Sequence, residues 1–193
     1  MKIAFCLFKY SPYSGLSLDF GRILEECLNR GHSAHVFVSE WQGERPEGAQ
    51  FTVLESPKIS LKFSNHAQNE QFHNKLQVEL KKQAFDVVVG FNKMPDLDVY
   101  YGADICYIGR TVPRYPALYK LTTRYKHRYL LEASVFSTQS KTLILSLSEK
   151  EKSVYQEHYF TPDSRFYLLP PTLDHRFSPV LDRTTARANL RAE

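Results

Sequence analysis

Two short loops of this 193-residue chain bring together residue types that bind phosphates and sugar hydroxyls. The first loop follows the apolar residues 3–8 and contains Ser14, Gly15 and Leu16. Gly15 allows a ligand to approach the backbone, and the unpaired N–H groups at the start of a helix attract an anion. The loop therefore fits a phosphate or a diphosphate. A simple turn, followed by a helix that Ser17 caps, remains the alternative.

Asp19 follows this loop, and we place it in the first turn of the expected helix. The helix dipole stabilises a carboxylate in that position whether or not it has a function. The functional interpretation is that Asp19 orients a substrate hydroxyl at the edge of a sheet. Both interpretations stay open on spacing alone.

The second loop follows the apolar residues 86–91 and is densely polar. Asn92 and Lys93 carry groups that bind sugar hydroxyls or a phosphate. Asp98 and Asp104 can accept hydrogen bonds from an acceptor hydroxyl. We take all four residues as candidates for an acceptor site, with a merely solvated loop as the alternative.

Residues 107–131 combine cations and tyrosines without an acidic side chain. The residues that we expect to face a membrane are Arg110, Arg114, Tyr115, Tyr119, Lys120, Arg124, Tyr125, Lys126 and Arg128. Lys120, Arg124 and Arg128 are four apart, which predicts one stripe on a helix over residues 117–136. Such a stripe suits the headgroup region of an anionic membrane. A nucleic-acid surface and a solvated helix would use the same residue types.

Several other kinds of site find no support in the sequence. The seven histidines show no metal-ligand spacing beside carboxylates, and no serine or cysteine lies in a nucleophile-elbow motif. The three cysteines are widely spaced and fit buried free thiols in a reducing cytoplasm. No apolar stretch approaches the roughly 20 residues that span a bilayer. We therefore expect neither a metal site nor a membrane-spanning helix.

The hydrophobic pattern alternates between strands and helices along the chain. Strands are expected over residues 2–8, 34–38, 51–54, 86–91, 142–147 and 166–169, and helices over 16–28, 72–82, 117–136 and 149–159. Helical crossovers between strands indicate a parallel sheet, so we predict an α/β, Rossmann-like, doubly wound fold. The continuous apolar strand at 86–91 should lie centrally in that sheet.

The expected domain covers residues 1–170. Residues 171–193 contain prolines and then Arg183, Arg187 and Arg191 but few apolar side chains, which is typical of a linker. We therefore expect this tail to lead into a further domain.

Sequence motifs spread over residues 1–171 resemble those of the lipopolysaccharide core glucosyltransferases, in the retaining glycosyltransferase family four. The motifs are Ala-Phe-Cys-Leu-Phe-Lys-Tyr at 4–10, Gly-Leu at 15–16, Asp-Phe at 19–20, Arg-Gly-His at 30–32, Gly-Phe-Asn-Lys-Met-Pro at 90–95, Leu-Asp-Val-Tyr at 97–100, Ala-Asp at 103–104, Cys-Tyr at 106–107, Arg-Tyr at 124–125 and Leu-Pro-Pro at 169–171. The string at 90–95, with the Leu-Asp-Val-Tyr that follows, is the most specific of them.

This resemblance implies the amino-terminal, acceptor-side half of a glycosyltransferase B (GT-B) fold, in which two Rossmann-like domains face each other across a cleft. It implies transfer of glucose from UDP-glucose to an inner-core heptose of lipopolysaccharide, with retention and with neither metal nor cofactor. The enzyme would rest on the anionic cytoplasmic face of the inner membrane, with no nucleic-acid partner. The family's donor-binding domain does not appear in this sequence, so we expect the chain alone to be inactive.

The resemblance also implies roles for individual residues. Gly15 and its neighbours would approach the diphosphate and the transferred sugar, and Asp19 and Asp104 would serve catalysis near the acceptor hydroxyl. Ser14 departs from the family's Gly-Gly pair, which implies a stiffer loop. The alternatives are a transferase of the same fold with another lipid-linked acceptor and a non-catalytic membrane- or partner-binding module.

Overall fold

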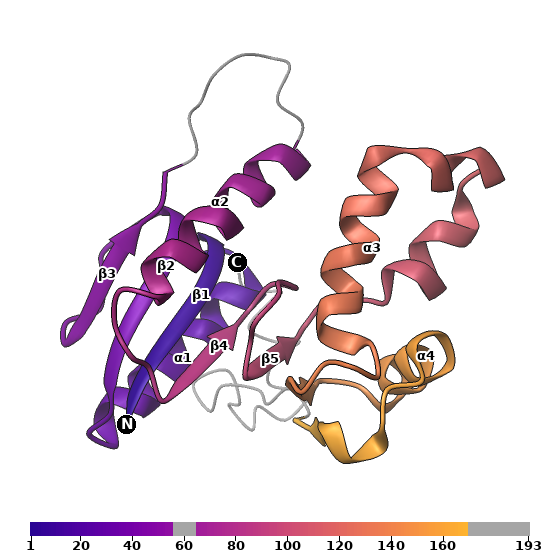
Figure 1. Ribbon diagram of the computed structural model, residues 1–193. Helices are drawn as coiled ribbons and strands as arrows, with labels where there is room; N and C mark the ends of the chain where they lie inside the picture. Colours follow the sequence, from indigo (N-terminus) through magenta and orange to yellow (C-terminus); the bar gives the residue numbers. More distant parts are fainter. Residues whose placement is uncertain (56–64, 170–193) are drawn as a thin grey trace, which may run out of the picture.

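A computed structural model describes residues 1–55 and 65–169. In this part of the chain, seven strands form one parallel sheet, flanked by four α-helices and by short 3-10 or π-helical turns (Figure 1). In order, the elements are β1 (Lys2–Tyr10), α1 (Gly15–Asn29), β2 (Ser33–Trp41), β3 (Ala49–Val53), α2 (Asn65–Leu80), β4 (Val87–Gly90), β5 (Val99–Gly102), η1 (Tyr107–Thr111), η2 (Val112–Arg114), η3 (Ala117–Leu121), α3 (Thr123–Phe136), β6 (Leu143–Ser146), α4 (Glu149–Tyr159), η4 (Asp163–Arg165) and β7 (Phe166–Leu168).

The strand order β3-β2-β1-β4-β5-β6-β7 confirms the predicted parallel α/β sheet and places β4 at its centre. The chain builds outward from β1 in one direction and then returns to build outward from β4 in the other. The point where the order reverses therefore lies between β1 and β4. Open α/β sheets bind their ligands at such a point, beyond the carboxyl ends of the strands.

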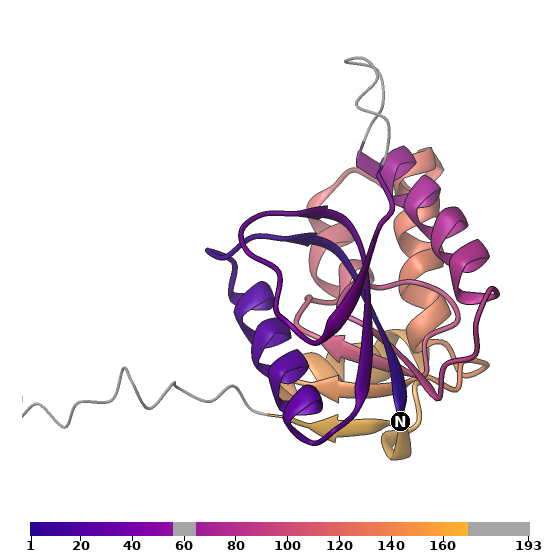
Figure 2. The ribbon, with the colours of Figure 1, turned by 90° about the vertical axis from the view of Figure 1, so that its left-hand side faces the viewer.

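Alternate residues of β1 face opposite sides of the sheet because the side chains of a strand have a period of two. Phe5 and Leu7 pack with α1 on one face, whereas Ala4 and Cys6 belong to the core under α2, α3 and α4. Figure 2 shows α1 on one side of the sheet and α2 and α3 together on the other. The carboxyl edge near β1 and β4 is thus flanked by helices on both faces.

The sequence pattern does not predict β5, whose residues are Val-Tyr-Tyr-Gly. Tyr100 and Tyr101 are both buried, Tyr100 in the core under α2 and α3 and Tyr101 in the core under α1. Two tyrosines in a four-residue strand give no continuous apolar run. The strand is defined by its pairing with β4 and β6 on either side.

The prediction of one helix over residues 117–136 is wrong. The segment forms η3 and α3, separated at Thr122, whose φ of −73° and ψ of 147° are extended. The Thr122 hydroxyl accepts a hydrogen bond from the Tyr125 N–H at 3.1 Å and so caps a new helix. Lys120 therefore lies in a different element from Arg124, and the predicted stripe of cations is interrupted.

The remaining predictions concern the start of α2, the tail, the cysteines and membrane-spanning helices. Helix α2 begins at Asn65, earlier than the expected residue 72. The expected linker at residues 171–193 lies outside the described residues. All three cysteines are free, Cys6 and Cys106 being buried and Cys27 only half-buried. No helix in the described ranges is long and apolar enough to cross a membrane.

Close packing at the end of β4 gives a first prediction. A Cβ added at Gly90 would overlap the buried Leu97 side chain, so we expect Gly90→Ala to lower the free energy of unfolding by about 1–3 kcal/mol. The control is Gly21→Ala inside α1, where a Cβ meets only the Tyr10 hydroxyl, at 3.9 Å. Alanine is the better helix former, so this control should keep or raise stability. Urea titration followed by circular dichroism compares them, and a fully stable Gly90→Ala protein would contradict this packing.

Candidate acceptor site at the carboxyl edge of the sheet

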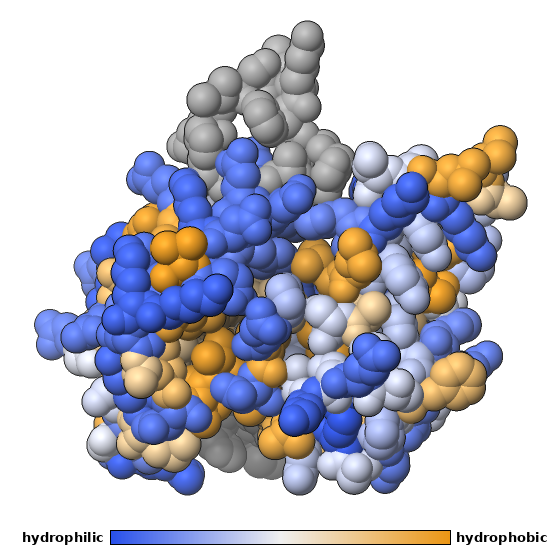
Figure 3. Space-filling model, viewed as in Figure 1, coloured by the Kyte–Doolittle hydropathy of each residue, from blue (hydrophilic) through white to orange (hydrophobic). Residues whose placement is uncertain are grey.

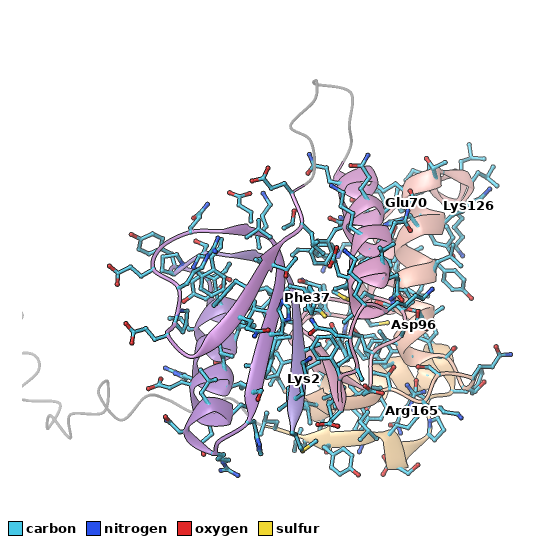
Figure 4. All side chains as sticks on the ribbon, turned by 60° about the vertical axis from the view of Figure 1, so that its left-hand side comes forward. Lys2, Phe37, Glu70, Asp96, Lys126 and Arg165 are labelled. Carbon is cyan, nitrogen blue, oxygen red and sulfur yellow. The ribbon has the colours of Figure 1, made fainter. Side chains whose placement is uncertain are left out.

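A pocket of about 310 Å³ opens at the carboxyl edge of the sheet, where the strand order reverses. It is lined by residues from β1, α2, the two loops after β4 and β5, η1 and α3, namely Phe8, Asn69, Asn92, Lys93, Asp104, Ile105, Tyr107, Thr111, Arg128, Leu131 and Glu132. Figure 4 marks the two ends of the molecule, with Lys2 at the start of β1 and Lys126 and Glu70 at the opposite end. Three of the four residues expected at an acceptor site, Asn92, Lys93 and Asp104, are among those that line the pocket.

Asn92 holds the two strands together at the reversal point. Its side-chain oxygen accepts a hydrogen bond from the Phe8 N–H at 2.8 Å, just beyond the last pairing between β1 and β4. One end of its amide thus serves the backbone of β1. Within the described residues, no hydrogen bond is found for its NH₂ group, which lies at a pocket wall.

Lys93 forms a buried ion pair that the sequence does not predict. Its Nζ donates to Glu132 Oε2 at 2.5 Å and to the Ile105 carbonyl oxygen at 2.9 Å. The Lys93 side chain is 12% exposed and that of Glu132 is fully buried. The ammonium group also lies 5.2 Å from the ring centre of Tyr155. The lysine charge is therefore neutralised within the protein.

Glu132 collects donors from several elements. Its two carboxylate oxygens accept hydrogen bonds from Lys93 Nζ, the Tyr107 N–H at 2.8 Å, the Ile108 N–H at 3.1 Å, the Tyr159 hydroxyl at 2.8 Å and the Cys106 thiol at 3.5 Å. Burial raises the pKa of Cys106 to about 12, so the thiol stays protonated and can donate. Glu132 thereby fixes η1 against α3 and α4.

Sequence reasoning missed Glu132, although a signal was present. Glu132 shares one face of α3 with Val135 and Phe136, three and four residues further on, and all three are buried. A carboxylate on the apolar face of a helix needs a buried partner. In the structure that partner is Lys93, from the polar loop after β4.

Asp104 lies at the rim of the pocket and is exposed. Its backbone oxygen accepts a hydrogen bond from the Tyr155 hydroxyl at 3.0 Å, and its carboxylate lies 3.4 Å from the Tyr100 hydroxyl. The backbone is thus anchored by α4, and the residue is exposed and lines the pocket. This arrangement allows Asp104 to accept a hydrogen bond from a bound hydroxyl.

The first loop lies at the start of α1. Ser14 has ordinary extended angles, φ −94° and ψ 131°, so serine in place of the family's glycine is not strained. A Cβ at Gly15 would meet nothing within 4 Å, which leaves open space above the helix start beside Leu16. Ser17 does not cap the helix, because its buried hydroxyl accepts a hydrogen bond from the Ser11 N–H at 3.1 Å.

Asp19 lies in the second turn of α1, not the first, because the helix already begins at Gly15. Its Oδ2 accepts a hydrogen bond from the Tyr101 hydroxyl at 2.8 Å, and its Oδ1 lies 3.7 Å from Arg22. Burial and the Asp19 carboxylate both raise the pKa of Tyr101, so this hydroxyl remains a donor. Asp19 is not among the residues that line the pocket.

Asp98 does not join the other candidates. It immediately precedes β5, and its carboxylate accepts a hydrogen bond from the Val88 N–H at 2.8 Å, near the start of β4. This position is at the amino end of these strands, whereas the pocket lies at their carboxyl end. Asp98 therefore supports the sheet and is not part of the pocket.

The expected membrane-facing residues divide into two groups. Three of them bind within the protein: Arg110 pairs with Glu151 at 3.0 Å, the Tyr119 hydroxyl meets that of Tyr107 at 2.7 Å, and Arg128 lies 5.5 Å from the Tyr107 ring centre at the pocket wall. Tyr125 is half-buried against these rings. The exposed residues are Arg114, Tyr115, Lys120, Arg124, Lys126 and, despite its ring contact, Arg128.

Loss of the Glu132 carboxylate should be severely destabilising. Glu132→Ala leaves a buried ammonium group and several buried donors without their acceptor, so we expect the free energy of unfolding to fall by about 3–5 kcal/mol. Glu26→Ala removes an exposed partner of Arg30 on α1 and should change it by about 0.5 kcal/mol or less. Chemical denaturation of both variants measures the difference, and equal losses would show that the buried pair carries no special weight.

Comparison with known proteins places this site in context. No family model matches the chain. Over 180 residues, or 92% of its length, the chain is 39% identical to the lipopolysaccharide glucosyltransferase WaaG of Escherichia coli K12, and it covers 47% of that protein. The crystal structure of WaaG, a glycosyltransferase involved in lipopolysaccharide biosynthesis, matches with a TM-score of 0.85 at 35% identity, over 99% of this chain and 52% of the other.

The chain thus spans about half the length of the relative that it matches. The predicted fold, one half of a GT-B glycosyltransferase, is confirmed by the structural match. The resemblance drawn from the sequence motifs is confirmed as well, and this chain is therefore related in sequence and in fold to the lipopolysaccharide glucosyltransferases, over about half of their length.

Proposed function

We propose that the chain forms the amino-terminal, acceptor-side half of a hexosyltransferase that moves glucose from UDP-glucose to an inner-core heptose of lipopolysaccharide, with retention. The observation that carries the proposal is the pocket at the reversal point, built from the same residues, Asn92, Lys93 and Asp104, that carry the sequence resemblance. The 39% identity to a lipopolysaccharide glucosyltransferase supports the reaction class. The activity is proposed for the full-length protein.

Within this function, Asp104 and the loop at Gly15 take different tasks. Asp104 at the pocket rim would accept a hydrogen bond from the acceptor hydroxyl. The open space above Gly15, at the start of α1, would receive the donor's phosphates or sugar. Asp19, held by Tyr101, would contact a substrate hydroxyl near this helix. We propose that neither a metal nor another cofactor takes part, and that the donor is held mainly by the rest of the full-length protein.

We also propose that the protein rests on the anionic cytoplasmic face of the inner membrane. Leu118 and Leu121 are 74% and 71% exposed, although such side chains are usually buried. Figure 3 shows an apolar tip over this part of the molecule, at the upper right, beside hydrophilic side chains. The exposed cations Arg114, Lys120 and Arg124 belong to the same segment. Apolar side chains among cations are typical of a surface that enters the headgroup region.

The role of Asp104 is tested by Asp104→Asn in the full-length protein. Loss of the carboxylate should lower kcat/KM for transfer from UDP-glucose to heptose-bearing truncated lipopolysaccharide by on the order of 100-fold, without changing stability. The control is Asp96→Asn, an exposed aspartate whose φ of 60° asparagine also adopts readily. UDP release measures the rate. An inactive wild-type protein would refute the proposed reaction, and full activity of Asp104→Asn would refute only the role of Asp104.

Membrane docking is tested on vesicles that contain phosphatidylglycerol. Replacing Arg114, Lys120 and Arg124 by alanine should lower partitioning by on the order of 100-fold at low salt, since each cation contributes about 1 kcal/mol. Replacing the exposed Lys81, Lys141 and Lys150 by alanine, outside this segment, serves as the charge-matched comparison. Vesicle sedimentation gives the partition coefficients. Equal losses in both variants would point to net charge alone and against a docking surface.

A further inference from the structure

The pocket contains equal numbers of positive and negative groups. The charged residues that line it are Lys93, Arg128, Asp104 and Glu132, two cations and two anions, so their formal charges sum to zero. Lys93 and Glu132 form the deep pair, with 12% and 0% exposure. Arg128 and Asp104 are exposed. An anionic ligand therefore meets no net positive charge, either in the depth of the pocket or among its exposed groups.

Lys93 is a weak anion-binding group, because the protein already engages two of its donors and its charge. Its ammonium has three N–H donors. One binds Glu132 Oε2 and another binds the Ile105 carbonyl oxygen. To bind a phosphate, Lys93 would have to do so 2.5 Å from a buried carboxylate, whose repulsion of the phosphate offsets the attraction of the lysine.

The Glu132 carboxylate has no oxygen left to accept a hydrogen bond from a ligand. Both oxygens are already engaged by side-chain and backbone donors, including the N–H groups of Tyr107 and Ile108. The carboxylate is fully buried, so it acts on a ligand only through its charge and through Lys93. Glu132 is therefore a residue that sets specificity, and it takes no direct part in chemistry.

The remaining groups of the pocket suit hydroxyls. The side-chain amides of Asn69 and Asn92 offer donors and acceptors, and Asp104 offers an acceptor at the rim. A volume of about 310 Å³ is at the small end of ligand pockets, which begin at about 300 Å³. One sugar ring fits such a space better than an oligosaccharide does.

We propose that Glu132, by neutralising Lys93, makes this pocket selective for an uncharged, polyhydroxylated sugar ring and excludes a ring that carries a phosphate. The inference rests on the proposed function, because it assigns the charge state of the acceptor ring in that same site. It predicts that the acceptor heptose is bound before any phosphate is attached to it.

The test uses the ¹⁵N-labelled 193-residue chain and three probes: a methyl heptoside, its monophosphate and inorganic phosphate. The Asn92 side-chain amide and the Asp104 backbone amide report occupancy by NMR. In the wild type, only the unphosphorylated heptoside should shift these signals. Glu132→Gln leaves Lys93 without its counter-charge and should bind inorganic phosphate about 10- to 100-fold more tightly. Glu151→Gln, which removes a carboxylate paired with Arg110 outside the pocket, should behave as the wild type.

The double variant Lys93→Met/Glu132→Gln keeps the test decisive if Glu132→Gln does not fold, since it removes both charges of the buried pair together. This variant should still bind the heptoside and reject phosphate. Phosphate binding by the wild type that the double variant abolishes would overturn the inference, as would equal phosphate affinity of the wild type and a folded Glu132→Gln. If the wild type does not bind the heptoside, the assignment of this pocket to the acceptor sugar ring is wrong. Transfer activity of the full-length protein decides the proposed function separately.

Discussion

The buried ion pair between Lys93 and Glu132 is the interaction on which the carboxyl edge of the sheet depends. A single buried charge is unfavourable, so each member requires the other within hydrogen-bonding distance. Lys93 comes from the loop after β4 and Glu132 from α3, 39 residues later. Through Tyr107, Ile108 and Tyr159, the same carboxylate also holds η1 and α4. One buried charge thereby fixes the positions of four elements around the pocket.

The reversal of strand order explains why the pocket lies beside this pair. Beyond β1 and β4 the connections lead to opposite sides of the sheet, so no crossover fills the space between the two strand ends. The Asn92 side chain bridges that gap to the Phe8 N–H and keeps the edge closed at its base. A ligand at this edge can therefore contact groups from both halves of the sheet, as the lining residues show.

Much of the fold could be predicted because helix and strand periods are clear in the sequence. The central position of β4 follows from its continuous apolar residues, which require cover on both faces. The break at Thr122 could not be predicted, because the residues on both sides are compatible with helix and only the local cap decides. Asn92, Lys93 and Asp104 were predicted as a group because they are polar residues that come after the apolar strand expected at 86–91. Asp98 was grouped with them because β5 was not recognised; the structure places Asp98 at the amino end of β5, away from the pocket.

The composition of the basic, tyrosine-rich segment at residues 107–131 overstates the positive charge that its surface presents. Arg110 is paired with Glu151 and adds little to an outward charge, and the exposed Arg128 lies over the Tyr107 ring at the pocket. The outward part is the apolar tip at Leu118 and Leu121 with its neighbouring cations. Helix α3 begins beside this tip and carries Leu131, a pocket residue, eight residues further along. At about 1.5 Å per residue the pocket lies roughly 12 Å along α3 from the tip.

That separation connects the two proposals physically. If the tip enters the headgroups of the membrane, the pocket opening stands within roughly 12 Å of that level, and a sugar joined to a lipid by a few other sugars can enter it while its lipid stays in the bilayer. The buried pair at Lys93 then contributes twice. It anchors the base of η1, which leads to the tip, and it leaves the pocket without a net positive charge that would compete with the tip for anionic headgroups. Attraction to the membrane and recognition of a neutral sugar can thus be separate properties of neighbouring sites. Glu132 neutralises Lys93 in the pocket, and the cations of the tip remain to attract anionic headgroups.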